Sequence, residues 1–356
     1  MKKLLIINKT QFGYHIDSYK YCQYLKNYFE ITYICLDTKK PKIYEDNINI
    51  IYVQYQSSYL KRGLNYIKTC RSQIKNKKYD FIFLVYFIMA LFVKLGISKE
   101  NFILDIRTGS VNKSFLKRFI ANFILKIETL FFKKITIISI CLRKQLNISS
   151  KKSHILPLGS DPISNNAKNF DNINLLYVGT LHGRDIYKTI IALSKFIKNN
   201  KITYNISYDI IGFGTKEDEQ LLIKTIKDEN LNDKVIFHGR ITHDKLIPYF
   251  TKANIGVSFI PLIKHYQCQP PTKTFEYINS GLFCIATNTY EHERLISSKN
   301  GILCQDNIES FILGLEKFES IRDTLNSNII KNTLKNHSWE KIIKNNLLNY
   351  LLEKNR

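Results

Sequence analysis

Lys273 and Glu276 stand three positions apart, directly after two prolines and shortly before Gly281. Proline suits the first turn of a helix and glycine suits the residue that ends one, so we expect a short helix carrying both charges. A cation and a carboxylate at positions i and i+3 share one face of a helix. They could hold one polar ligand, with a phosphate at Lys273 and hydroxyl groups at Glu276. A solvated ion pair would have the same spacing, and the segment alone favours that simpler interpretation.

A second candidate site follows the predicted strand Leu175–Thr180, where a short loop leads into a helix expected from Asp185 to Lys198. Backbone N–H groups at a helix N-terminus attract anions. Gly179 would permit close approach of a ligand, and Arg184 would supply positive charge. The loop could therefore cradle a diphosphate, or it could be an ordinary strand-to-helix turn capped by Asp185.

Two polar clusters follow predicted strands in the first half of the chain. The first strand, residues 3–8, leads to Gly13 and His15, and a later short strand ends in Asp105 and Arg107. Ligands bind doubly wound sheets at the carboxyl ends of the strands, which places His15 where a substrate could lie. Asp105 and Arg107 could position an acceptor hydroxyl or a phosphate, and could equally form an ion pair that closes a turn.

The sequence lacks the motifs that are typical of several other kinds of chemistry. The sequence Gly212-Phe213-Gly214 has neither the third glycine nor the later acidic residue of a dinucleotide fingerprint, which disfavours NAD. The sequence shows no H-E-x-x-H, EF-hand, P-loop or kinase motif, and the eight histidines are dispersed. We therefore expect no metal site and no cofactor.

The positive charge is concentrated in the first half of the chain. The net charge is +23, of which +18 falls within residues 1–165. Two blocks dominate, at 59–79 and 112–144, and both place apolar residues at near-helical spacing among the basic ones. Such helices fit an anionic membrane surface. They would also fit a nucleic-acid backbone, and a generally lysine-rich composition would explain the excess but not its location.

The elements that would position these residues alternate strand and helix along the chain, with a first helix expected from 17 to 29 and a long basic helix from 114 to 134. A length of 356 residues with 44% hydrophobic content exceeds what one core usually supports, so we expect two α/β domains. The pattern restarts after a segment rich in turn residues near 157–169. Seven scattered cysteines without a C-x-x-C pair are typical of a reduced, cytoplasmic protein. The longest apolar run, 81–93, is too short to span a bilayer.

From 174 to 318, the order of these elements resembles the C-terminal half of the family 4 glycosyltransferases, which are retaining enzymes of the GT-B fold. The residues that carry the resemblance are Leu175–Thr180, Ile211–Gly214, Val235–Arg240, Tyr249–Ala253, Pro271–Tyr277 with Gly281, and Asn300–Leu303. The first half matches more loosely, through the first strand and its loop, Asp105–Arg107, Glu128 and Pro157–Asp161. Ser338-Trp339-Glu340 is similar to the start of the final helix of that family, which returns to the N-terminal domain.

The resemblance implies a fold and a division of the chain. The expected fold is GT-B, with two Rossmann-like doubly wound domains that face a cleft. The expected parts are an acceptor-binding domain at 1–160, a linker at 161–172, a nucleotide-sugar-binding domain at 173–335 and a returning helix at 336–356.

The resemblance also implies roles for individual residues. Glu276 matches the glutamate that binds the ribose of the donor, whereas Cys268 stands where the family has its first glutamate, so Gln267 or Gln269 would have to contact the sugar. Arg184 and Lys273 match phosphate-binding positions. The full donor-binding set is Gly179, Thr180, Arg184, Gly212, Gly239, Arg240, Thr272, Lys273 and Glu276. On the acceptor side the candidates are Asp105 and His15 for catalysis, and Gly13 and Arg107 for acceptor or phosphate binding.

The implied function is transfer of a sugar from a nucleotide-diphosphate sugar, UDP-linked by expectation, to a lipid-linked or surface-polysaccharide acceptor, with retention and without a metal. The expected location is the cytoplasmic side of the membrane, with the basic domain against the anionic surface. Two alternatives remain from the sequence. One is a non-catalytic nucleotide-binding protein of the same fold, suggested by Cys268, and the other is a basic nucleic-acid-binding protein, although no reader motif for nucleic acid is present.

Overall fold

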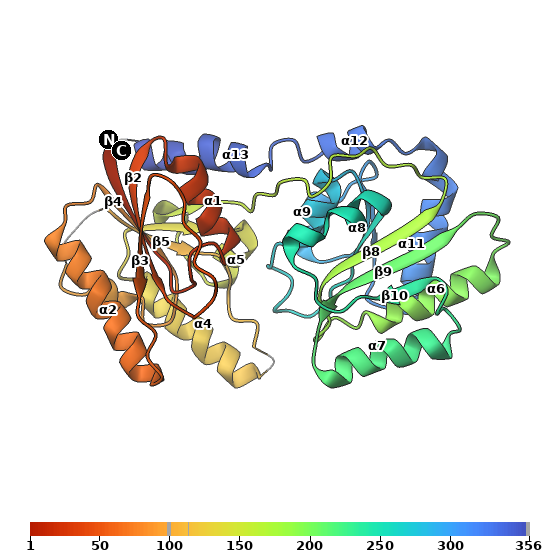
Figure 1. Ribbon diagram of the computed structural model, residues 1–356, viewed down its shortest axis with the longest axis horizontal. Coiled ribbons are helices and arrows are strands. Elements are labelled where there is room, and N and C mark those ends of the chain that lie inside the picture. The colour runs from red at the N-terminus through yellow and green to blue at the C-terminus, as the bar shows by residue number, and fades with distance from the viewer. Residues whose placement is uncertain (98–100, 113, 354–356) are drawn as a thin grey trace. The chain divides into compact units, whose positions relative to one another are not determined.

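The computed structural model describes residues 1–97, 101–112 and 114–353. Lys113 of the second basic block and the last three residues of the predicted C-terminal helix lie outside them. The chain divides into two compact units (Figure 1). Unit 1 contains Met1–Gly159 and Trp339–Arg356, and unit 2 contains Ser160–Ser338. The segment expected as a linker, 161–172, belongs to unit 2.

Unit 1 is built on a parallel sheet of seven strands in the order β3-β2-β1-β4-β5-β6-β7. Helices lie on both sides of it, with α2 on one side and α1 and α5 on the other in Figure 1. A parallel sheet that is covered on both faces needs strands that are apolar on both faces, and β1, β4 and β5 have that character. The strands are β1 (Lys2–Ile7), β2 (Phe29–Leu36), β3 (Ile48–Val53), β4 (Phe81–Val85), β5 (Phe102–Ile106), β6 (Lys134–Ile137) and β7 (Ser153–Ile155). The helices are α1 (Ile16–Leu25), α2 (Tyr59–Asn76), α3 (Leu91–Lys94), α4 (Phe115–Thr129) and α5 (Ile140–Gln145).

The end of the chain completes unit 1. A helical segment runs through α13 (Trp339–Ile342), a wider π-helical stretch (Ile343–Leu348) and α14 (Asn349–Leu352). The Trp339 ring lies edge-on to the buried ring of Tyr21, with their centres 6.3 Å apart. Gly159 lies so close to the indole that a Cβ atom there would be 2.6 Å from it. The final helix therefore returns to the N-terminal unit, as the sequence predicts.

Unit 2 contains a parallel sheet of six strands in the order β10-β9-β8-β11-β12-β13. The strands are β8 (Ile173–Thr180), β9 (Ile206–Phe213), β10 (Val235–Phe237), β11 (Ile255–Ser258), β12 (Phe283–Thr287) and β13 (Gly301–Cys304). The helices are α6 (Tyr187–Asn199), α7 (Lys216–Asp228), α8 (Ile247–Lys252), α9 (Thr272–Asn279), α10 (Tyr290–Leu295), α11 (Ile308–Ile321) and α12 (Ser327–Asn332). Two Rossmann-like units and a returning C-terminal helix confirm the predicted fold class.

Some boundaries differ from the sequence prediction. The first helix was expected to run from 17 to 29, but α1 ends at Leu25 and Phe29 begins β2. Phe29 is fully buried, and its burial in the sheet outweighs the local helical pattern. The basic helix expected from 114 to 134 ends at Thr129. Among the described residues, no helix is long and apolar enough to cross a membrane.

Candidate functional site

The short helix predicted around Lys273 and Glu276 is α9, and buried hydrogen bonds fix it to the sheet of unit 2. The Thr274 hydroxyl donates to Ser258 Oγ in β11 at 2.8 Å. His292 Nδ1 lies 2.7 Å from a carbonyl oxygen, so it must donate, which leaves Nε2 to accept from the Ser258 hydroxyl at 3.0 Å. Burial lowers the pKa of His292 to about 4, so this anchor is neutral at physiological pH. The position of Glu276 is thus set by buried, uncharged hydrogen bonds between α9 and the sheet.

Glu276 lies between two basic side chains, Lys273 and His243. Lys273 Nζ is 2.5 Å from Oε2, and His243 Nε2 is 3.7 Å from Oε1. Only 9% of Glu276 is exposed. Burial raises the pKa of this carboxyl group, but the nearby His243 side chain and the charge of Lys273 outweigh burial, and the pKa ends below its ordinary value. Glu276 is therefore an ionised hydrogen-bond acceptor near the surface of unit 2.

The sequence analysis missed His243, which lies in a short 3-10 helix, His243–Lys245, after β10. It is 33 positions from Glu276, and only the folded chain brings the two side chains together. No local signal marks it, although it follows Gly239 and Arg240 by a few residues.

Three predicted donor-site glycines form a row across the carboxyl ends of β8, β9 and β10. Gly179 and Gly212 are paired in register, and the N–H of Gly212 donates to the carbonyl oxygen of Gly239 at 2.9 Å. A Cβ atom on Gly212 would lie 2.0 Å from the Gly179 carbonyl oxygen, and Gly239 has a φ of +66°. Because glycine has no side chain, the backbone is uncovered at the carboxyl ends of these strands, where ligands of doubly wound folds bind.

Arg184 lies beside the start of α6. Its guanidinium carbon is 4.1 Å from the centre of the Tyr266 ring. Its Nη1 atom is buried and has no hydrogen-bond partner among the described residues. Tyr266 is two residues before Cys268, so Arg184 contacts the loop that leads into α9.

The N-terminus of α6 is not capped by Asp185. That residue has a φ of +52° and its carboxylate pairs with Lys188 at 3.0 Å. No side chain within the described part of the chain caps this helix, so the alternative interpretation of a capped turn is wrong. The N–H groups of Lys188 and Thr189 already donate to the carbonyl oxygens of Asp185 and Ile186, so Arg184 and the positive end of the helix dipole are what favour an anion at this position.

The remaining donor-side candidates are spread around this edge. Thr272 is the first residue of α9 and Thr180 the last of β8. The exposed Arg240 stacks over Phe213, with 4.9 Å between the guanidinium carbon and the ring centre. Gln267 accepts from the N–H of Tyr290 at 2.9 Å, so part of its side chain is already used.

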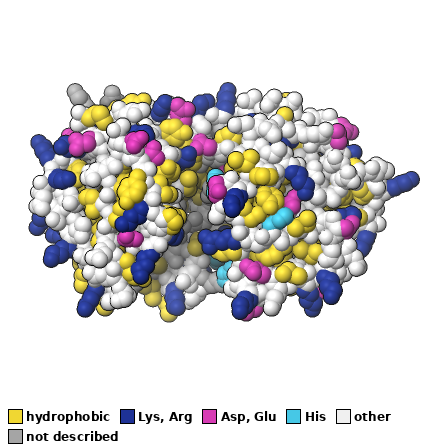
Figure 2. Space-filling view, viewed as in Figure 1, with side chains coloured by type: hydrophobic (Ala, Val, Ile, Leu, Met, Phe, Trp, Pro, Cys, Tyr) yellow, Lys and Arg dark blue, Asp and Glu magenta, His cyan; other side chains and the backbone are white. Residues whose placement is uncertain are grey.

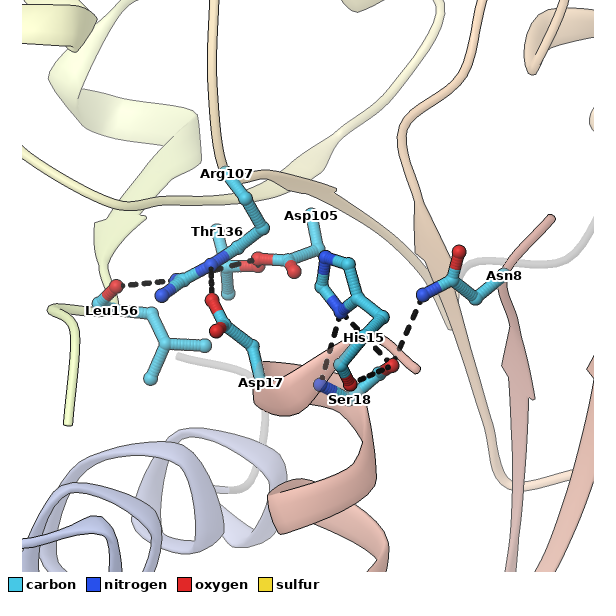
Figure 3. Close-up of polar contacts among 8 residues, drawn as sticks. All are labelled: Asn8, His15, Asp17, Ser18, Asp105, Arg107, Thr136 and Leu156. Carbon is cyan, nitrogen blue, oxygen red and sulfur yellow. Dashed lines mark hydrogen bonds and ion pairs between the residues drawn. The ribbon is translucent and has the colours of Figure 1, made fainter. Parts of the chain in front are cut away.

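In unit 1, Arg107 is the centre of a buried charged cluster (Figure 3). Its Nε atom donates to Asp17 at 2.5 Å, and its Nη1 atom donates to the carbonyl oxygen of Leu156 at 2.7 Å. Nη1 also lies 4.0 Å from Asp105, so the close partner of Arg107 is Asp17 and not the aspartate two positions away. The charges of Tyr21, Asp17 and Asp105 outweigh burial and raise the pKa of Arg107.

Asp105 is completely buried and accepts a hydrogen bond from Thr136 at 2.7 Å. Burial raises its pKa to about 6. Its Oδ2 atom and Nη2 of Arg107 have no hydrogen-bond partner within the described residues. The Asp105 side chain has no exposed surface, so it does not contact a substrate in this structure. Asp105 and Arg107 instead hold the start of α1.

His15 is the N-cap of α1, and its Nδ1 atom accepts from the N–H of Ser18 at 3.3 Å (Figure 3). Burial lowers the pKa of this imidazole. Gly13 has a φ of +86° and lies against Ile43, which a Cβ atom would approach to 2.4 Å. The fold thus brings His15 close to the cluster through α1, whereas Gly13 has a conformational role in the preceding loop.

The structure therefore divides the predicted site residues into a donor-side group in unit 2 and an acceptor-side group in unit 1. No group of three or more potential metal ligands occurs among the described residues.

Solved structures with this fold match the chain over almost its whole length. A sucrose-phosphate synthase from Thermosynechococcus elongatus is 13% identical, with a TM-score of 0.75 and 96% of each chain covered. HepE from Anabaena, in complex with UDP and glucose, is 11% identical, with a TM-score of 0.74 and coverage of 99% of this chain and 100% of that one. WaaG, a glycosyltransferase involved in lipopolysaccharide biosynthesis, is 13% identical, with a TM-score of 0.72 and coverage of 99% and 100%.

Residues 163–336 match the family model of glycosyl transferases group 1. No curated protein sequence matches the chain. The fold is that of the GT-B glycosyltransferases, and most of unit 2 is similar to the group 1 family model.

Proposed function

We propose that this protein transfers a sugar from a UDP-sugar to a lipid-linked or surface-polysaccharide acceptor, with retention of configuration at the anomeric carbon. The observation that carries the proposal is the ionised Glu276 on an anchored helix, within a domain of the glycosyltransferase group 1 type. A buried carboxylate between two basic side chains suits a ligand that both donates and accepts hydrogen bonds. The ribose of a nucleotide is such a ligand.

The diphosphate of the donor would bind at Arg184, the N–H groups at the start of α6, and Lys273. Departure of a nucleoside diphosphate concentrates negative charge on its phosphate oxygens. Prearranged cations and N–H dipoles stabilise that charge in the transition state. The glycine row at Gly179, Gly212 and Gly239 would let the donor approach the backbone, and the solved complex of HepE with UDP and glucose supports a nucleotide donor for this fold.

We propose a front-face displacement for the chemical step. The acceptor oxygen forms its bond to the anomeric carbon on the face from which the diphosphate leaves, and the acceptor proton passes to the leaving phosphate oxygen. No protein nucleophile is needed, and the protein cations would take the place of a metal. On the acceptor side, we assign contact with the substrate to His15 and a positioning role to Asp105 and Arg107.

We propose that the enzyme works on the cytoplasmic face of the membrane, with α4 against anionic lipid. Three phenylalanines stack along this helix at i, i+4 spacing, with ring centres 6.3 and 6.2 Å apart. Phe115, Phe119 and Phe123 are 73%, 58% and 53% exposed. Large exposed apolar faces mark interaction sites, and flanking Lys117, Arg118 and Lys126 supply charge that is complementary to anionic headgroups.

Transfer of radiolabelled sugar from a panel of nucleotide sugars would test the function. We expect transfer by the wild-type protein from a UDP-sugar and a loss of at least about 100-fold in Glu276→Gln, because the ribose loses its charged acceptor. Glu309→Gln removes an exposed carboxylate on α11 and should retain full activity. Donor binding without turnover across many acceptors would support the non-catalytic alternative, and NMR of the product anomer would test retention.

Sedimentation with lipid vesicles would test the membrane contact. The Phe119→Ser/Phe123→Ser variant should lose binding to vesicles that contain phosphatidylglycerol. The control, Ile223→Ser/Leu313→Ser, alters two exposed apolar residues of unit 2 and should bind as the wild type does. Unchanged vesicle binding, or a dimer that the two serines dissociate, would contradict the proposal.

A further inference from the structure

Basic and aromatic side chains gather on the loops that follow β1, β2 and β3 in unit 1. We define the basic-aromatic platform as Tyr14, Lys39, Lys40, Tyr55 and Arg62. Lys40 Nζ lies 4.5 Å from the centre of the Tyr14 ring. Lys39 Nζ and the guanidinium carbon of Arg62 lie 5.3 and 4.9 Å from the centre of the Tyr55 ring. Three contacts between a cation and an aromatic ring thus lie on neighbouring segments of unit 1.

The fold places these loops together. Strands β3, β2 and β1 are neighbours in the sheet and run parallel, so the loops after them meet at one edge. This is the edge at which doubly wound sheets bind ligands. Arg62 joins the group from the first turns of α2, which follows β3.

Hydrogen bonds between neighbouring loops hold the Tyr14 and Lys40 part of the platform in place. The side chain of Gln11, 1% exposed, donates to the Lys40 carbonyl oxygen at 2.8 Å and accepts from the N–H of Thr38 at 2.8 Å. The Tyr14 hydroxyl donates to the carbonyl oxygen of Pro41 at 3.0 Å. Gly13 lets Ile43 approach the loop closely, and Lys39 is held at a φ of +63°. A surface that is ordered before binding loses less entropy when a ligand arrives.

The charge of the platform is positive. The neighbouring carboxylates already have cationic partners, because Asp37 pairs with Lys42 at 3.3 Å and Glu45 with Lys26 at 2.7 Å. The rings of Tyr14 and Tyr55 are each 38% exposed. Aromatic faces pack against the apolar C–H face of a sugar ring, and lysine and arginine bind carboxylates and phosphates. Figure 2 shows dark blue and yellow side chains interspersed on the visible face of unit 1.

We propose that the platform binds an acceptor saccharide that carries phosphate or carboxylate groups. The inference rests on the proposed glycosyltransferase function and narrows its acceptor from any glycan to an anionic one. The sugar ring stacks on Tyr14 or Tyr55, and its anionic group meets Lys39, Lys40 or Arg62. A free saccharide and the headgroup of a lipid-linked saccharide share this chemistry.

Calorimetric titration of the full chain with soluble saccharides of equal length tests the proposal. The probes are neutral maltotetraose, maltotetraose 1-phosphate and tetragalacturonate. We expect both anionic probes to bind at least about tenfold more tightly than the neutral one, with the difference reduced at high salt. The Lys39→Gln/Lys40→Gln variant should remove most of that preference. The control, Lys224→Gln/Lys227→Gln, removes two exposed lysines of α7 and should keep it.

Vesicles distinguish the sources of the anionic group. Phosphatidylglycerol vesicles with and without a polyprenyl diphosphate sugar are compared for both lysine variants. If vesicles with the lipid-linked sugar bind more protein than plain vesicles do, and the Lys39→Gln/Lys40→Gln variant loses this difference, the acceptor is lipid-linked. Equal affinity for neutral and anionic saccharides overturns the proposal. The proposal is also overturned if the protein shows no preference among saccharides and the platform lysines instead bind plain anionic vesicles or a short single-stranded oligonucleotide.

A donor assay separates this proposal from the proposed function. The Lys39→Gln/Lys40→Gln variant should bind UDP as tightly as the wild type, because neither lysine belongs to the donor-side group. Normal UDP binding with no preference for anionic saccharides refutes the platform alone. Absence of UDP binding in the wild type refutes the donor site and leaves the saccharide titration as an independent result.

Discussion

The hydroxyl group of Tyr277 accepts a hydrogen bond from the backbone N–H of Val178 at 2.8 Å. Tyr277 follows Glu276 in α9, and Val178 lies in β8 two residues before the end of the strand. The ring is fully buried against Gly256, where a Cβ atom would lie 2.3 Å from it. The Tyr277 side chain thus connects α9, which carries the candidate ribose-binding residue Glu276, to the strand that carries Gly179.

Tyr277→Phe should destabilise unit 2 by about 1–3 kcal/mol, because the N–H of Val178 would be buried without a partner. Chemical denaturation followed by fluorescence would measure the loss. UDP binding should weaken severalfold, since α9 loses one of its attachments. The control is Tyr290→Phe, which alters a tyrosine that is 36% exposed. An unchanged UDP affinity would show that Thr274 and His292 suffice to position Glu276.

Gly212→Ala should abolish UDP binding while leaving unit 1 intact. A methyl group there would lie 2.0 Å from the Gly179 carbonyl oxygen, so β8 and β9 must separate at the end that carries the glycine row. We expect a loss of stability of about 1–3 kcal/mol or more. Gly63→Ala is the matched control, because nothing lies within 4 Å of a Cβ atom at that helical position. That change should stabilise the protein by about 0.5–1 kcal/mol.

Asp105 should make the protein less stable as pH rises. Its pKa is about 6 in the folded state against an ordinary value of 3.8, so the folded chain holds this proton more tightly than the unfolded chain. The contribution is fully present below pH 3.8 and is lost as pH rises to about 6, with a total of about 3 kcal/mol. Asp105→Asn should remove this component from the dependence of unfolding free energy on pH.

The control for this measurement is Asp323→Asn, since the Asp323 side chain is 87% exposed. Urea unfolding at pH values from 4 to 7 would compare the two variants with the wild type. Parallel curves for Asp105→Asn and the wild type would contradict a raised pKa at Asp105.

The sequence predicted features that depend on residues close together in the chain. Proline, the i, i+3 pair and Gly281 define α9, and Gly281 has the expected left-handed conformation, with φ of +81°. The succession of strands and helices along the chain and the returning helix followed from landmarks spread along the sequence. These features are local, or are repeated in a fixed order, so one sequence is enough to identify them.

Contacts between distant residues were not predictable. An ion pair between Asp105 and Arg107 was one of two alternatives from the sequence, but the closer partner of Arg107 is Asp17, 90 residues away. The amphipathic pattern of α4 indicated a helix, but whether its phenylalanines face a core or solvent depends on what the rest of unit 1 covers. His243 shows the same limit, because its contact with Glu276 depends on how the loop after β10 folds beside α9.

His243→Asn should raise the pH at which UDP binding is lost. His243 and Lys273 both lower the pKa of Glu276 against the effect of burial, and the contact with His243 is the largest single cause that lowers it. A lowered pKa keeps the carboxylate ionised as pH falls, so binding should be retained down to the folded-state pKa and lost below it. Without His243 that pKa rises, and affinity for UDP should begin to fall at a higher pH than in the wild type.

Titrations of UDP between pH 4 and 8 would locate the midpoint, with exposed Lys245→Gln as the control for a nearby change of charge. If Lys273 alone kept Glu276 ionised, Lys273→Met would shift the midpoint and His243→Asn would not, which would remove His243 from the site.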